Sequence, residues 1–238
     1  MTPPDANPAD DEARLAPSVE DIRLLRGPEG STGDLVRSLR IWREFSRGFW
    51  ALRGIGPCVT VFGSARFREG DPWYEMAREV GGRLADAGFA VMTGGGPGIM
   101  EAANRGAQEH GGRSIGCCIQ LPREQHTNPY VDRSVSFHYF FVRKVMLVKY
   151  SRAFLFLPGG YGTLDEVFEI ATLVQTGKVQ RFPIVGMGRE YWRNLEELRQ
   201  EAMVPAGTIS PLDVELFMAT DDPADAVAHI VEHANHAR

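Results

Sequence analysis

From residue 57 onward, short apolar segments alternate with amphipathic ones, and this alternation constrains the fold more than any other feature of the chain. The segments expected to be strands are Cys58–Phe62, Phe89–Thr93, Ser114–Ile119, Ala153–Leu157, Phe182–Met187 and a short run at Leu216–Ala219. Strands that are apolar throughout and separated by helices are typical of a parallel sheet covered on both faces. The sequence therefore predicts an α/β fold: a single Rossmann-like domain over residues 57–238 with a doubly wound parallel sheet.

Amphipathic segments fill the intervals between these strands. The predicted helices are Pro72–Ala87, Ile99–His110, Phe137–Tyr150, Leu164–Thr176, Tyr191–Met203 and a last helix starting near Pro223. The segment from Gln120 to Ser136 is expected to be irregular, because it follows neither the helical nor the strand period.

The residues before position 57 divide into two parts. Residues 1–33 are rich in Pro, Asp, Gly and Ser, so we expect a disordered or loosely attached tail. Residues 34–56 carry Leu35, Leu39, Trp42, Phe45 and Phe49 at helical spacing, which predicts an amphipathic N-terminal helix. This helix is expected to pack on the domain or to meet a partner subunit, and the general tendency toward burial favours packing.

Composition excludes several classes of function. The formal net charge is −5, so no global positive field favours nucleic acid. No apolar run approaches the roughly 18 to 20 residues needed to span a bilayer, and the start of the chain does not resemble a signal peptide. The three cysteines suggest neither a disulfide framework nor a zinc site. We expect a reduced, soluble, cytoplasmic protein that binds neither nucleic acid nor membrane.

Two glycine-rich turns follow predicted strands and open predicted helices. They run from Thr93 to Gly98 and from Pro158 to Thr163. Glycine lets the backbone approach a ligand closely, and free N–H groups at a helix start favour phosphate. One such turn is as well explained by tight chain reversal, whereas two at the carboxyl ends of parallel strands favour a shared nucleotide pocket. The candidate substrate-binding residues are Ser64, Gly95, Gly96, Gly98, Lys144, Gly159, Gly160, Gly162 and Thr163.

Neither turn matches a motif for a larger cofactor. The spacing G-x-G-x-x-G fails in both, and no Gly-Lys-Ser/Thr follows either. This argues against a nicotinamide cofactor and against ATP hydrolysis, and we expect no cofactor and no metal.

Glu166 and Arg143 are the candidate catalytic residues, and each also has a structural explanation. Thr163 and Glu166 have the spacing of a helix capping box, which alone would explain the glutamate. Arg143 lies among apolar residues, so it could simply bury its stem and solvate its head. It could equally turn its guanidinium toward a phosphate or a leaving base.

The segments Gly94–Ala107 (GGGPGIMEAANRGA) and Pro158–Glu166 (PGGYGTLDE) resemble the Lonely Guy family, and the second fits its P-G-G-x-G-T-x-x-E pattern at every fixed position. The similarity runs from about Val59 to the C-terminus. It implies a homodimeric Rossmann-like enzyme that converts a purine nucleoside 5′-monophosphate, a cytokinin riboside 5′-monophosphate or AMP, into free base and ribose 5-phosphate. It also implies that Arg143 and Glu166 are the catalytic pair and that Gly159, Gly160, Gly162 and Thr163 form the phosphate-binding turn. Many members carry Met-His-x-Arg-Lys where this chain has Phe140-Phe141-Val142-Arg143-Lys144, which affects the expected base preference.

The alternatives to this function differ in how well the sequence supports them. Lysine decarboxylation, a label often given to the family, would need a pyridoxal-phosphate lysine, and the surroundings of Lys144 supply none of the usual cofactor contacts. His229 and His233 match H-x-x-E-H, but they lie on a polar terminal helix without a further ligand. The main alternative is a nucleotide- or molybdenum-cofactor-binding carrier or sensor without hydrolysis. An interaction role for the aromatic helix conflicts with neither.

Overall fold

The computed structural model describes residues 30–120 and 126–234, with only the backbone for residues 30–32. The expected tail therefore lies outside the described residues up to position 29. Within the described ranges, no helix is both long and apolar enough to cross a membrane.

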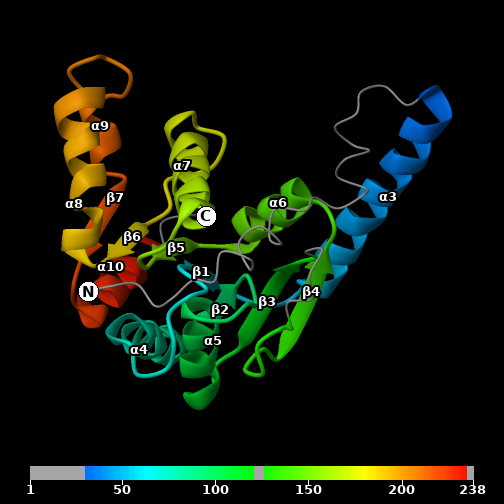
Figure 1. The fold of residues 1–238 in the computed structure, drawn as a ribbon, viewed down its shortest axis with the longest axis horizontal. Coiled ribbons are helices and arrows are strands. Elements are labelled where there is room, and N and C mark those ends of the chain that lie inside the picture. Colours follow the sequence, from blue (N-terminus) through cyan, green and yellow to red (C-terminus); the bar gives the residue numbers. More distant parts are fainter. Residues whose placement is uncertain (1–29, 121–125, 235–238) are drawn as a thin grey trace, which may run out of the picture.

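Among the described residues, seven parallel strands form one sheet (Figure 1). They are β1 (Cys58–Phe62), β2 (Ala90–Thr93), β3 (Ser114–Ile119), β4 (Arg133–Phe137), β5 (Ala153–Phe156), β6 (Ile184–Met187) and β7 (Phe217–Thr220). Their spatial order is β4-β3-β2-β1-β5-β6-β7, and Thr60 of β1 pairs with Met92 on one side and Phe154 on the other. The predicted α/β fold with a doubly wound parallel sheet is confirmed.

Helices connect the strands. They are α3 (Gly30–Ala51), α4 (Pro72–Asp86), α5 (Ile99–Glu109), α6 (Phe140–Tyr150), α7 (Tyr161–Gln175), α8 (Arg189–Glu197), a π-helical turn η2 (Leu198–Met203), α9 (Pro211–Val214) and α10 (Pro223–Ala234). The last predicted helix before β7 is thus interrupted by the π-helical turn at Leu198.

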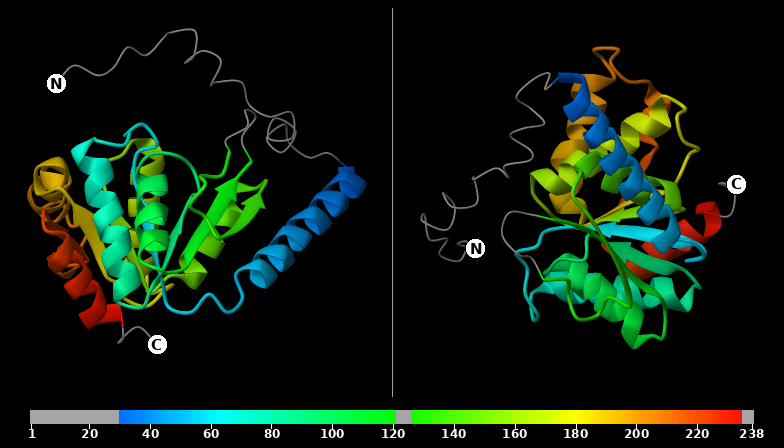
Figure 2. Two further views of the ribbon diagram at one scale, coloured as in Figure 1. Left: turned by 90° about the horizontal axis from the view of Figure 1, so that it is seen from below. Right: turned by 90° about the vertical axis from the view of Figure 1, so that its right-hand side faces the viewer.

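The sheet separates two hydrophobic cores. The right-hand view of Figure 2 shows helices on both faces of the sheet. Successive side chains of a strand point to opposite faces, so Val59 and Val61 pack with α4, α5 and α10. Cys58 and Phe62 pack with α6, α7 and α8 on the other face. Because both faces of β1 are buried, its five residues are all shielded from solvent, as its unbroken apolar sequence predicts.

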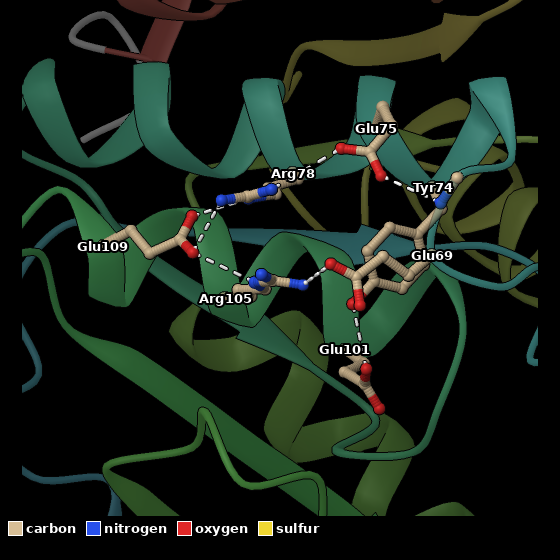
Figure 3. Close-up of polar contacts among 8 residues, drawn as sticks. Glu69, Tyr74, Glu75, Arg78, Glu101, Arg105 and Glu109 are labelled. Atoms are coloured by element: carbon tan, nitrogen blue, oxygen red, sulfur yellow. Dashed lines mark hydrogen bonds and ion pairs between the residues drawn. The ribbon is translucent and has the colours of Figure 1, made fainter.

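Helices α4 and α5 are held together by close backbone approach and by surface ion pairs (Figure 3). A Cβ on Gly106 would lie 1.8 Å from the carbonyl oxygen of Arg78, so only glycine allows this contact. Arg78 donates to Glu109 at 2.6 and 2.8 Å, and Arg105 donates to Glu69 at 2.7 Å and to Glu109 at 3.0 Å. This rigid pair supports the loops that follow β1 and β2.

Strand β4 corrects the expectation of an irregular segment from Gln120 to Ser136. Arg133–Phe137 pairs in parallel with β3 at the edge of the sheet. Only Val135 and Phe137 are buried, because an edge strand needs apolar residues on one face alone. Arg133 and Ser134, which precede them, are exposed, so the segment has no continuous apolar run that would predict a strand. Helix α6 accordingly begins at Phe140, three residues after the predicted start.

Helix α3 begins four residues before the predicted position and ends five before it, at Ala51. Its C-terminal half packs on the domain, where a Cβ on Gly48 would lie 3.0 Å from both Met146 and Phe137. In its N-terminal half, Leu35 and Leu39 are 62% and 55% exposed, and Trp42, just past the middle of the helix, is 66% exposed. The expected packing therefore holds only for one face of the C-terminal half, where Ile41 and Phe45 contact the core while Trp50 is 82% exposed.

Candidate active site

A pocket of about 300 Å³ lies at the carboxyl ends of β1 and β5. These adjacent strands lead to opposite halves of the sheet, and such a switch point leaves a crevice between the diverging loops. The sequence-predicted residues that line the pocket are Ser64, Arg143, Gly160, Gly162, Thr163 and Glu166. Arg66 and Met100 also line it and were not foreseen.

The second glycine-rich turn forms one wall of this pocket. Helix α7 begins at Tyr161, with Gly160 as its N-cap and no side chain capping it. Thr163 therefore lies inside the first turn of the helix, and the predicted capping box with Glu166 is wrong. The first-turn N–H groups of Tyr161 and Gly162 have no preceding helical carbonyl, which suits them to bind a phosphate.

Gly159 shapes the turn from outside the pocket lining. A Cβ there would lie 2.1 Å from Oγ1 of Thr163 and 3.1 Å from the backbone nitrogen of Ser64. The hydroxyl of Tyr191 on α8 donates to the carbonyl of Gly159 and accepts its N–H at 3.3 Å. Sequence reasoning missed Tyr191, which lies 32 residues away and belongs to no motif.

The first glycine-rich turn supports the pocket rather than lining it. Gly98 has a φ of +70°, and a Cβ there would lie 2.5 Å from the carbonyl oxygen of Ser64. The N–H of Ile99 donates to that same oxygen at 3.0 Å. Gly95 and Gly96 are buried, with the Gly95 N–H bonded to Thr93 Oγ1 at 2.9 Å. This turn thus fixes the loop after β1 that carries Ser64.

Asn104 holds the first turn together from α5. It is fully buried, and its Oδ1 accepts from Thr93 Oγ1 at 2.6 Å and from Asn128 Nδ2 at 3.0 Å. Its own Nδ2 donates to Ser114 Oγ at 2.8 Å, while Asn128 also donates to the Gly96 carbonyl at 3.0 Å. An asparagine on the apolar face of a predicted helix was the signal that could have identified this buried network.

Arg143 reaches the pocket from α6. Its Nε donates to the carbonyl of Cys117 at 2.9 Å, which anchors the guanidinium against β3. A Cβ on Gly94 would lie 2.6 Å from one terminal nitrogen of Arg143, so the first glycine turn provides space for this group. Of the two readings of Arg143, its position in the pocket lining favours the ligand-facing one.

Glu166 is the most unusual titratable group of the site. It is 3% exposed, and its Oε2 has no hydrogen-bond partner in the part of the chain that the structure describes. Burial raises the pKa of this carboxyl to about 7, although the positive charges of Lys144 and Arg143 act to lower it. A buried, unpaired carboxylate facing a pocket is a catalytic candidate, because such a group is costly to keep without a function.

Comparison with known proteins identifies the family of this chain. A family model described as "Possible lysine decarboxylase" matches residues 100–230. The cytokinin riboside 5′-monophosphate phosphoribohydrolase of Mycobacterium tuberculosis is 31% identical over 157 residues, which cover 64% of this chain and 82% of that protein. An Arabidopsis thaliana protein of the same name is 29% identical over 182 residues, or 74% of this chain and 81% of that one. The chain belongs to the Lonely Guy family.

Solved structures of molybdenum cofactor proteins have a similar fold. The molybdenum cofactor carrier protein of Chlamydomonas reinhardtii matches with a TM-score of 0.57 and 26% identity, over 75% of this chain and 98% of that one. The molybdenum cofactor binding protein of Rippkaea orientalis matches with a TM-score of 0.55 and 23% identity, over 74% and 96%, and supports the fold alone. The curated relatives support an enzyme of the Lonely Guy kind.

Lysine decarboxylation would need a lysine at the site, but Lys144 lies outside the pocket lining. Lys144 forms ion pairs with Asp165 at 2.7 Å and with Glu169 at 2.5 Å, and so joins α6 to α7. It was a candidate substrate-binding residue, but the structure places its ammonium in this clamp. From there its charge still acts on Glu166.

Possible metal ligands are the remaining candidate groups outside this pocket. Across residues 30–120 and 126–234, no group of three or more His, Cys, Asp or Glu side chains is arranged to hold a metal ion. The rings of His229 and His233 lie 4.2 Å apart on α10, and Nδ1 of His233 contacts the carbonyl of His229.

Proposed function

We propose that this protein hydrolyses the N-glycosidic bond of a purine nucleoside 5′-monophosphate, of the cytokinin riboside or AMP type. The products are the free base and ribose 5-phosphate. The observation that carries the proposal is the buried, unpaired carboxylate of Glu166, which faces a pocket built at a helix N-terminus.

The pocket residues suit the parts of such a substrate. The first turn of α7, with Gly160, Gly162 and Thr163, offers N–H and hydroxyl donors to the 5′-phosphate. Glu166 lies one helical turn beyond Thr163, so a bound phosphate would bring the ribose toward its carboxylate. Remote phosphate contacts of this kind hold the reacting bond in place.

The chemistry requires a negative group near the sugar. Cleavage of the C1′–N bond passes through an oxocarbenium-like sugar, as in glycoside hydrolysis. The ionised Glu166 would stabilise that positive charge or orient the attacking water or a ribose hydroxyl. Water supplies the oxygen bonded to C1′, and its proton balances the charge on the departing base. Arg143 would hold the substrate or stabilise charge on that base.

We further propose that the protein is a homodimer. Four large apolar side chains on α6 and α7 are substantially exposed: Phe140 is 50%, Phe141 43%, Val145 44% and Phe168 44% exposed. Apolar groups gathered on adjacent helices are typical of a protein interface. Light scattering should give twice the chain mass, and a monomer at micromolar concentration would refute this assembly.

A carrier function remains the second candidate, because the molybdenum cofactor carrier protein of Chlamydomonas reinhardtii has this fold. A carrier would use the glycine-rich turns for binding and would have no need of an ionisable Glu166.

Chromatographic detection of released base separates the two functions. AMP and isopentenyladenosine monophosphate are incubated with wild type, Glu166→Gln, Arg143→Ala and, as a control, Glu196→Gln, which changes an exposed carboxylate on α8. Base release by wild type and the control, with loss in both pocket variants, supports hydrolysis. If wild type binds AMP and releases no base from either substrate, the hydrolase proposal fails and the carrier reading replaces it.

A further inference from the structure

A second cleft, of about 410 Å³, lies between α3 and the turn that joins β4 to α6. Figure 1 shows α3 beside β4 and α6. Its lining comprises Arg40, Arg43, Glu44 and Arg47 of α3 together with Gln120, His138 and Tyr139. None of these residues lines the candidate active site. The three arginines are spaced by three and four positions, so they lie on one face of the helix.

Among the described residues of this lining, the single acid is already engaged. The carboxylate of Glu44 accepts the backbone N–H of His138 at 3.0 and 3.2 Å and that of Tyr139 at 3.3 Å. It thereby caps the start of α6, whose N-cap residue Tyr139 provides no capping side chain. The carboxylate is consequently directed at backbone N–H groups, and three guanidinium groups outnumber it in the cleft.

The arginines themselves are not all used by the fold. Arg47 donates to the carbonyl of Ser136, whereas Arg43 makes no hydrogen bond or ion pair with any residue that the structure describes. Like charges one helical turn apart repel each other, so an anion bound between the arginines would lower that repulsion. Concave shape and excess positive charge together indicate a binding site.

We propose that this cleft binds a compact phosphorylated metabolite carrying at least two negative charges. The guanidinium fork matches phosphate oxygens in bidentate geometry, and the positive end of the α6 dipole adds to the attraction. This site is separate from the proposed catalytic pocket, and it does not depend on the proposed hydrolysis. It lies next to that pocket through α6, because the N–H of Arg143 donates to the carbonyl of Tyr139 at 3.2 Å.

Calorimetric titration with inorganic pyrophosphate tests the site in the full chain. The variants are Arg40→Ala/Arg43→Ala, a matched control Arg53→Ala that removes an exposed arginine just beyond α3, and Arg143→Ala, which alters the catalytic pocket. The double variant should bind pyrophosphate at the cleft at least about tenfold more weakly than wild type. Arg53→Ala and Arg143→Ala should retain this binding, and it should weaken with added salt. Thermal unfolding verifies that each variant is folded.

Two results would overturn the proposal. One is pyrophosphate binding by the folded double variant that equals that of wild type. The other is that wild type does not bind pyrophosphate, whereas a full-length variant with Asp10→Asn, Asp11→Asn and Glu12→Gln does bind it. That second result would mean that carboxylates of the chain itself occupy the cleft, in place of a metabolite.

Discussion

Arg143 and Glu166 face one pocket from two different helices without bonding to each other. Arg143 is anchored through Nε to the carbonyl of Cys117, while Oε2 of Glu166 has no hydrogen-bond partner among the described residues. The nearby positive charge does not offset burial, so the pKa of Glu166 remains raised to about 7. The site thus holds a buried carboxyl group whose ionised form a positively charged sugar would stabilise.

Replacing Glu166 by glutamine should stabilise the protein at pH 8 and much less at pH 5. The folded pKa of about 7 lies above the ordinary value of 4.5, so the folded state binds this proton more tightly than the unfolded state. Stability contributed by protonated Glu166 is therefore lost as pH rises from about 4.5 through about 7. The variant removes a penalty on the order of 1–3 kcal/mol at pH 8. Urea unfolding at both pH values measures it, and equal stability of variant and wild type at pH 8 would refute the expectation.

The same group should control the pH dependence of catalysis. If the ionised carboxylate stabilises the sugar cation, kcat/KM for AMP rises with pH through about 7, the pKa of Glu166 in the free protein. Steady-state rates between pH 5 and 9 provide the profile. Glu196→Gln should leave the profile unchanged, whereas a rate that falls through this range would assign Glu166 the role of an acid.

The glycines of the second turn should differ in their tolerance of alanine. A Cβ on Gly159 would lie 2.1 Å from Oγ1 of Thr163, whereas one on Gly160 meets no atom within 4 Å. Gly159→Ala is expected to lower the free energy of unfolding by about 1–3 kcal/mol, because the turn must shift. Gly160→Ala, the matched control, should change it by less than about 1 kcal/mol. Similar urea midpoints for the two variants would contradict this difference.

Asn104→Ala should destabilise the protein by about 1–3 kcal/mol, because it leaves buried polar groups of Thr93, Ser114 and Asn128 without their partner. The first glycine turn would also loosen, so KM for AMP should rise. Thermal unfolding and steady-state kinetics measure the two effects, with Gln108→Ala as an exposed control on the same helix. An unchanged melting temperature would show that the network contributes little.

The sequence predicted the elements whose pattern is set locally. Strands buried on both faces, such as β1 and β5, are continuous apolar runs and were placed within a residue. Strand β4 was missed because its polar residues reflect an edge position, which depends on the neighbouring β3. The start of α7 was misplaced because Thr163 was expected to be its N-cap, whereas Gly160 is the N-cap and no side chain caps the helix.

The candidate site was predicted unevenly for a related reason. Motif spacing located the pocket residues after β5, whereas the first glycine-rich turn, which follows β2, supports the pocket and does not line it. It could not locate Lys144, which faces Asp165 and Glu169 across α7, because neighbours in sequence on a helix point in different directions. Tyr191 and Asn104 act through contacts between distant segments, which spacing alone does not encode.

The end of α3 also bears on how the molecule unfolds. Leu52 and Ile55, just beyond the helix, are 0% and 3% exposed and belong to the same core as Phe137 and Met146. Cleavage of the chain between residues 51 and 57 would therefore remove part of the interior together with α3. We expect such a cut to reduce the cooperativity of the entire α/β unit, and not merely to release an accessory arm.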